Sequence, residues 1–306
     1  MVTHTPRWML AAALAAVFLV AGCRVMPFPS PVNSPTSVPL PEITNTPASP
    51  PTTPPTPLPT LAPTPTAEPE ACSNPSGTFL DEQFPSEILG ESLQYRVYLP
   101  PCYSESTGEP YPVLYLLHGQ QQDATVWEKL GAMQAADDLI LSGSAQPFLV
   151  VMPTERLFLL DLKDSDYDQV IAEELVPAID ASFPTCTDSD CRAIGGISRG
   201  GAWAVRTGFS NPDLFGFIGA HSPAVFGADL ARLPTLLREI GVERFPRIYL
   251  DTGNQDDYRE SAFRLEGLLT QFAVTHEWHL NEGFHNFDYW LTHAPEYMRW
   301  YARNWQ

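Results

Sequence analysis

The sequence predicts an α/β fold with a mostly parallel central sheet and helices on both of its faces. Short apolar runs of strand length alternate with stretches whose apolar residues recur at helical spacing. The central runs are almost continuously hydrophobic, which is typical of strands buried between two helix layers. The last helix is placed to begin at Pro295, because proline is tolerated in a first turn. The predicted strands are residues 95–99, 113–117, 148–152, 193–197, 217–220, 248–250 and 274–280, and the predicted helices are 168–180, 202–208, 258–272 and 295–305.

The N-terminus has the features of an export signal. Arg7 supplies a positive charge, and residues 8–21 form an apolar run that ends in small residues. This run is shorter than the roughly 20 apolar residues that a transmembrane helix needs, so a cleaved signal over residues 1–22 is predicted. The Val-Ala-Gly-Cys sequence that ends at Cys23 resembles a bacterial lipobox. Lipidated Cys23 would anchor the exported protein in the cell membrane on its extracytoplasmic side, and a soluble secreted protein is the alternative.

Residues 23–70 are predicted to be a linker and residues 71–306 a single catalytic domain. The stretch 27–69 holds 16 of the 32 prolines, among threonine, serine and alanine, and has almost no charge. Proline fixes φ and removes a backbone donor, so this stretch is expected to be an extended spacer. A proline-rich ligand for a partner domain is the alternative. The 236 residues that follow suit one domain.

Charge and cysteine content narrow the classes of partner. The formal net charge is −19, which argues against nucleic acid and anionic lipid headgroups as electrostatic partners. If Cys23 is lipidated, four cysteines remain, and disulfides are expected in an exported protein. Cys186 and Cys191 are close enough to form a loop, which leaves Cys72 with Cys102, although three pairings remain open. The cysteine spacings match no common zinc pattern, so no metal and no cofactor are predicted.

A candidate nucleophile lies in the Gly-Ile-Ser-Arg-Gly motif at residues 196–200. The motif follows an apolar strand and opens a stretch able to continue as a helix. A serine at such a turn has a strained backbone that lifts its hydroxyl above the sheet, and small neighbours avoid clashes there. Ser198 is therefore the predicted nucleophile, with a plain surface turn as the alternative.

The serine needs a histidine to remove its proton and a carboxylate to orient that histidine. His285 is the predicted base, because it lies in a loop after the last predicted strand. His221 is the second candidate for the base, with lining of the pocket as its other role. The histidines expected to be structural or solvated are His276 and His279, inside a predicted strand, and His293, just before the last predicted helix.

Three aspartates follow the strand that ends at Leu250, and they are candidates for the acid. Asp256 is preferred. Asp251 could instead bond nearby backbone amides in the turn, and Asp257 could be a surface charge at the start of a helix. All three remain open at this point.

The negative charge that develops on an attacked carbonyl oxygen needs backbone N–H donors. One is predicted to come from Arg199, directly after the nucleophile. The other is expected from Gln120, in the loop that begins His118-Gly119 after a central strand. His118 precedes the serine in the chain and is assigned a structural role, in which its ring holds this loop together.

These motifs resemble those of the putative esterase family, which includes esterase D-like S-formylglutathione hydrolases, feruloyl and acetylxylan esterases, and mycolyltransferases. The resemblance covers about residues 78–305 and rests on the segments 112–119, 195–201, 251–256 and 283–285. It implies an α/β-hydrolase fold. It also implies Ser198, Asp256 and His285 as the catalytic triad, with Asp256 as the aspartate that closes a Gly-x-x-Asp segment. Arg199 stands where such esterases often have methionine, which puts a cation near the site.

Three functions are consistent with the sequence. The first is ester hydrolysis through an acyl-enzyme, on a small-molecule or polysaccharide-linked ester. The second is acyl transfer to a sugar or lipid hydroxyl with the same residues. The third is a non-catalytic surface-binding domain, which a missing triad member would indicate. Trp127, Trp290 and residues 223–245 could shape an acyl or aryl pocket, with packing as the alternative.

Overall fold

The computed structural model describes residues 74, 76–106, 108–156, 164–225 and 227–305. The predicted signal, the lipidation site Cys23, the linker and Cys72 lie outside the described residues. Within the described part of the chain, no helix combines the length and the apolar character that crossing a bilayer requires.

The described residues form an eight-stranded sheet with the order β1-β2-β4-β3-β5-β6-β7-β8. Strands β3 to β8 run parallel, while β1 and β2 are antiparallel additions at one edge. The predicted mostly parallel α/β sheet is therefore confirmed. The strands are β1 (Thr78–Pro85), β2 (Ser92–Leu99), β3 (Val113–Leu117), β4 (Leu149–Pro153), β5 (Arg192–Ile197), β6 (Phe217–His221), β7 (Arg247–Gly253) and β8 (His276–Asn281).

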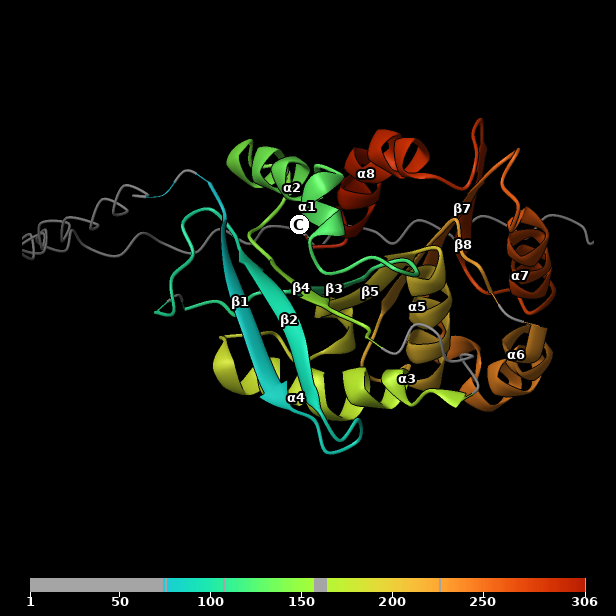
Figure 1. Ribbon diagram of the computed structural model, residues 1–306, viewed down its shortest axis with the longest axis horizontal. Helices are drawn as coiled ribbons and strands as arrows, with labels where there is room; N and C mark the ends of the chain where they lie inside the picture. Colours follow the sequence, from blue (N-terminus) through green and yellow to red (C-terminus); the bar gives the residue numbers. More distant parts are fainter. Residues whose placement is uncertain (1–73, 75, 107, 157–163, 226, 306) are drawn as a thin grey trace, which may run out of the picture. The chain divides into compact units, whose positions relative to one another are not determined.

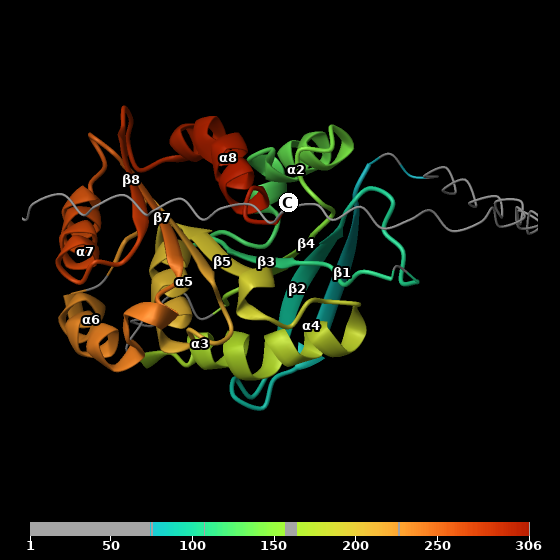
Figure 2. The same cartoon turned by 180° about the vertical axis from the view of Figure 1, so that it is seen from behind.

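Helices cover both faces of this sheet (Figures 1 and 2). One face carries α1 (Val126–Lys129), α2 (Ala132–Leu141) and α8 (Phe287–Ala302). The other face carries α3 (Tyr167–Gln169), η2 (Val170–Leu175), α4 (Val176–Ser182), α5 (Arg199–Ser210), α6 (Gly227–Ile240) and α7 (Arg259–Gln271). Two single turns, η3 (Ser189–Cys191) and η4 (Val242–Arg244), precede β5 and β7.

Every residue of β3, β4, β5 and β6 is buried, because these central strands pack against helices on both faces. In the β5–β6 register Gly195 lies opposite Gly219, and a Cβ atom built on either one would fall 1.7 Å from the hydroxyl of Tyr301 on α8. The two glycines therefore leave the space that this buried tyrosine fills.

Several elements differ from the sequence-based expectations. Strand β1 was not expected, because it is an edge strand with a largely exposed surface. The predicted start of the last helix at Pro295 is wrong, since α8 begins at Phe287 and contains Pro295. The Asn286 side chain accepts a hydrogen bond from the Tyr289 amide and caps the helix eight residues earlier. His293 consequently lies inside α8.

The predicted Cys186–Cys191 disulfide is formed, with the two Cα atoms 5.7 Å apart. It closes a loop directly before β5, at the N-terminal end of the strand that carries the nucleophile motif. Cys102 is also disulfide-bonded.

Candidate active site

Ser198 lies at the sharp turn between β5 and α5. Its φ is 56°, a left-handed value that is strained for a residue with a side chain. Its amide donates to the His221 carbonyl at 3.0 Å, which ties the turn to the end of β6. A Cβ atom on Gly200 would come within 2.3 Å of the Leu117 carbonyl, so only glycine permits α5 to approach β3 this closely. This is the strained turn expected from the motif.

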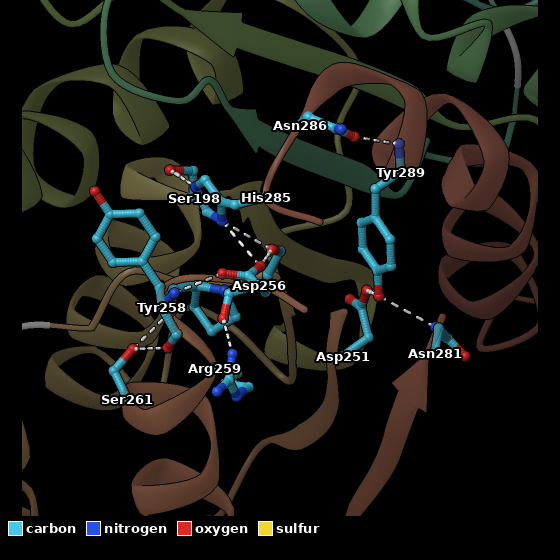
Figure 3. A network of polar contacts seen from close by, with 12 residues as sticks. Ser198, Asp251, Asp256, Tyr258, Arg259, Ser261, Asn281, His285, Asn286 and Tyr289 are labelled. Carbon is cyan, nitrogen blue, oxygen red and sulfur yellow. Dashed lines mark hydrogen bonds and ion pairs between the residues drawn. The ribbon is translucent and has the colours of Figure 1, made fainter. Parts of the chain in front are cut away.

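The structure brings Ser198, His285 and Asp256 together in one hydrogen-bonded row (Figure 3). His285 Nε2 lies 2.7 Å from Ser198 Oγ, and His285 Nδ1 lies 2.9 Å from Asp256 Oδ2. A carboxylate can only accept, so Nδ1 carries the ring proton and Nε2 is left to accept the proton of the serine hydroxyl. The arrangement has the geometry in which a serine can be activated as a nucleophile.

Asp256 is fully buried and is held as a carboxylate by several donors. Burial alone would raise its pKa. Hydrogen bonds from His285, from the Ser222 hydroxyl and from the Tyr258 amide at 2.6 Å outweigh burial, and the pKa of Asp256 lies below its ordinary value. Ser222 Oγ also lies 3.1 Å from His285 Nδ1, so this hydroxyl touches both the acid and the base.

The loop after β3 is fixed by the ring of His118. His118 Nε2 accepts a hydrogen bond from the Glu155 amide at 2.8 Å, and Nδ1 donates to the Gly119 carbonyl at 2.7 Å. Burial lowers the pKa of His118, which keeps the ring neutral in this role. The Gly119 amide donates to Gln122 Oε1 at 2.9 Å. The predicted structural role of His118 is confirmed, and Gln120 follows in the loop as an exposed residue.

The Arg199 side chain is buried and neutralised. Its Nε and Nη2 donate to the two carboxylate oxygens of Glu155 at 2.8 Å and 2.7 Å, and Trp203 Nε1 donates to the same carboxylate at 3.0 Å. The cation that Arg199 was expected to put near the site is therefore paired with the Glu155 carboxylate. The guanidinium ties the start of α5 to the end of β4.

A second buried polar cluster contains two of the other candidate residues, His221 and Asp251. Asp251 accepts hydrogen bonds from His221 at 3.1 Å, Tyr289 at 2.6 Å and Tyr297 at 2.9 Å. The other ring nitrogen of His221 lies 2.8 Å from the Tyr301 hydroxyl. His221 therefore neither lines a pocket nor acts as the base, and Asp251 does not bond backbone amides of the turn. Burial lowers the pKa of His221.

The remaining predicted residues occupy different surroundings. Asp257 is exposed just before α7, as its surface-charge alternative expected. Trp127 is fully buried in the core, with its Nε1 3.3 Å from the Leu117 carbonyl. The ring of Trp290 meets the His285 ring edge-on, with centroids 5.1 Å apart. The segment 223–245 contains α6, whose apolar side packs into the core.

Sequence reasoning missed Ser222 and Glu155. Each follows a buried parallel strand within two residues, at the carboxyl edge of the sheet where sites in α/β proteins form. A polar residue at that position is the signal that could have identified them. Among the described residues no group of three or more His, Cys, Asp or Glu side chains could hold a metal ion.

The fold and the Ser-His-Asp row define a serine hydrolase of the α/β-hydrolase class. The chain belongs to the family described as "Putative esterase", whose profile matches residues 86–299. The resemblance inferred from the sequence motifs is therefore confirmed.

Two curated proteins are similar in sequence to part of this chain. An endo-1,4-beta-xylanase/feruloyl esterase of Xylanibacter ruminicola is 30% identical over 213 residues, which are 66% of this chain and 29% of that protein. An esterase of Mycobacterium tuberculosis is 28% identical over 149 residues, which are 46% of this chain and 31% of that protein. The chain thus spans less than a third of the length of each of these relatives.

Solved structures share the fold. A ferulic acid esterase superimposes with a TM-score of 0.65 at 23% identity, covering 75% of this chain and 99% of that chain. An S-formylglutathione hydrolase of Staphylococcus aureus gives a TM-score of 0.60 at 19% identity, covering 74% of this chain and 96% of that chain. These neighbours support the α/β-hydrolase fold.

Proposed function

We propose that the chain hydrolyses esters of aromatic carboxylic acids through an acyl-enzyme on Ser198. The observation that carries this proposal is the row of hydrogen bonds from Ser198 Oγ to His285 at 2.7 Å and from His285 to Asp256 at 2.9 Å. It supplies a nucleophile, a base and an acid in the order that acyl transfer to serine requires.

The reaction takes place in two halves. Ser198 Oγ attacks the ester carbonyl carbon while His285 Nε2 takes the hydroxyl proton, and Asp256 stabilises the imidazolium. The carbonyl oxygen becomes negative and receives hydrogen bonds from the amides of Gln120 and Arg199. The tetrahedral intermediate breaks its bond to the alcohol oxygen, which receives the proton from His285. Water, activated by His285, then releases the acid from the serine.

Exposed aromatic side chains beside the triad support an aromatic acyl group. Phe284 and Phe287 flank His285 in the chain and are 54% and 38% exposed. The Tyr258 ring, 48% exposed, lies with its centroid 4.5 Å from that of His285 (Figure 3). Large apolar side chains grouped at the surface of a soluble domain often mark a binding site. The name of the Xylanibacter relative, which includes feruloyl esterase, agrees with this substrate class.

We also propose that the enzyme acts outside the cytoplasm, anchored through Cys23. The apolar run at 8–21 and the Val-Ala-Gly-Cys sequence that ends at Cys23 support this location. Metabolic labelling with a fatty acid tests it. The wild-type protein is expected to carry the label and Cys23→Ser to lack it, and an unlabelled wild-type protein would contradict the anchor.

A comparison of ester substrates tests the reaction and the substrate class together. Methyl ferulate is expected to give a kcat/KM at least about tenfold above that of methyl hexanoate, because only the aromatic acyl group can stack on the exposed rings. Ser198→Ala is expected to fold and to lose turnover of both esters. Turnover by that variant would contradict the mechanism, and a preference for the aliphatic ester would contradict the substrate class.

A further inference from the structure

We propose that Glu155 is a positioning residue that aligns both backbone donors of the oxyanion site. Glu155 lies two residues after β4, it is 4% exposed, and none of its atoms belongs to the Ser-His-Asp row. Its backbone contacts the loop that carries one donor, and its side chain contacts the residue that carries the other. The inference rests on the proposed ester hydrolysis at Ser198.

The backbone of Glu155 acts on the Gln120 donor through His118. A backbone N–H can only donate, so the Glu155 amide fixes the lone pair on His118 Nε2 and the proton on Nδ1. That proton is donated to the Gly119 carbonyl. In a trans peptide the carbonyl of one residue and the N–H of the next point in opposite directions. Holding the Gly119 carbonyl against His118 therefore turns the Gln120 N–H away from that ring.

The side chain of Glu155 acts on the Arg199 donor. Its carboxylate binds the Arg199 guanidinium through two nearly equal hydrogen bonds, at 2.8 Å and 2.7 Å, and both side chains are buried. A paired contact of this kind fixes orientation as well as distance. Arg199 is the first residue of α5, so this contact sets the position of the helix start whose amide serves the oxyanion.

One residue thus joins the loop after β3 to the start of α5, and the separation of the Gln120 and Arg199 N–H groups depends on it. Oxyanion donors act by being aimed before the reaction begins, and the loss of one such donor lowers kcat by about 100-fold to 1,000-fold. A donor that is displaced but still present is expected to lower kcat by a smaller factor than the removal of that donor. Substrate binding in the ground state does not depend on these donors to the same degree.

Glu155→Gln tests the proposal, with p-nitrophenyl acetate as substrate and phenylboronic acid as inhibitor. The boronic acid forms a tetrahedral adduct on Ser198 Oγ that places an oxygen in the oxyanion site. We expect kcat to fall by about tenfold with KM changed by less than about twofold, and the inhibition constant of the boronic acid to rise by about the same factor as kcat falls.

The chain offers a matched control at the other end of β5. Arg192, the first residue of β5, is 1% exposed and is paired by two hydrogen bonds, at 3.0 Å and 2.9 Å, with Asp180 on α4. Asp180→Asn weakens a comparable, partly buried ion pair at the opposite end of β5 from Ser198. We expect it to lower stability while kcat of the folded protein stays within about twofold of wild type.

The double variant Glu155→Gln with Arg199→Met keeps the test valid if the unpaired Arg199 prevents folding. It leaves no unpaired buried charge, so it is expected to fold and still to show the reduced kcat. Wild-type kcat and wild-type boronic acid affinity in folded Glu155→Gln or in the double variant would overturn the proposed role of the Glu155 side chain in placing the Arg199 donor. Turnover by Ser198→Ala would instead overturn the proposed function.

Discussion

The Asp256 carboxylate has more hydrogen-bond donors than its histidine alone supplies. The Ser222 hydroxyl contacts the same oxygen, Oδ2, that His285 uses, and Ser222 is 1% exposed. We predict that Ser222→Ala lowers kcat by about tenfold, because a hydrogen bond to a charged group contributes about 1.5–3 kcal/mol and its loss lets the carboxylate rotate. The measurement is the initial rate of ester hydrolysis at saturating substrate.

Ser261→Ala is the control for that variant. The Ser261 hydroxyl donates to the carbonyls of Pro223 and Tyr258, close to the triad but without contact to it. Its kcat is expected to stay within about twofold of wild type. If Ser222→Ala also kept its kcat, the extra donor on Asp256 would have no role in the reaction.

Single site residues could be predicted from the sequence where they belong to a short motif or stand next to the residue that they contact. Ser198 and Gly200 belong to one short motif, and His118 stands next to the glycine whose carbonyl it holds. Ser222 and Glu155 have no such signature. Their partners lie in segments that are distant in the sequence and meet only in the folded sheet. The spacing of residues along the chain therefore does not predict these contacts.

The loop that contains His285 leads directly into α8, and the N-cap of that helix determines where the loop ends. Asn286 directly follows His285, and its side chain accepts from the Tyr289 amide at 3.0 Å (Figure 3). We predict that Asn286→Ala lowers the free energy of unfolding by about 1 kcal/mol, because an N-cap is lost, and lowers kcat/KM because His285 is less firmly placed. Urea unfolding and initial rates measure the two effects.

The exposed Thr292, in the middle of the same helix, provides the comparison. Its hydroxyl donates to the Asp288 carbonyl one turn earlier and makes no cap. Thr292→Ala is expected to leave both the stability and kcat/KM near wild type. Equal losses in the two variants would show that the cap has no special role.

Strands with a long apolar run could be predicted from the sequence, whereas the edge strand and the start of the last helix could not. The apolar strand at 113–117 was predicted with the bounds that β3 has, because five consecutive buried residues leave a clear signal. Strand β1 has no such run, because it lies at the edge of the sheet and most of its residues are exposed to solvent. The start of α8 was missed because Pro295 suggested a first turn, whereas the cap at Asn286 decides the boundary.

The molecule as a whole is expected to lose stability in mild acid. Burial lowers the pKa of both His118 and His221 below the ordinary value of 6.5. In the unfolded chain both bind a proton as the pH falls through about 6.5, while in the folded chain both resist it. The unfolded state therefore gains protons first, and the stabilisation that is fully present above pH 6.5 is lost as the pH falls towards the lowered values.

We predict that the free energy of unfolding is smaller at pH 5.5 than at pH 7.5, with both histidines contributing. Urea unfolding at constant ionic strength measures the difference, and recovery of the curve after return to the higher pH serves as the control. The lowered pKa of Asp256 acts in the same direction at still lower pH. Stability that was constant or rose towards pH 5.5 would contradict the prediction.

The two glycines that pack against Tyr301 limit the substitutions that this chain can accept during evolution. Gly195, Gly219 and Tyr301 fill one space between two strands and a helix, and a methyl group at either glycine would overlap the tyrosine hydroxyl. An alanine in either strand is therefore accepted only after the tyrosine has become smaller, and a smaller residue in the helix first leaves an empty space. Evolution through single substitutions therefore has to pass a less stable intermediate here.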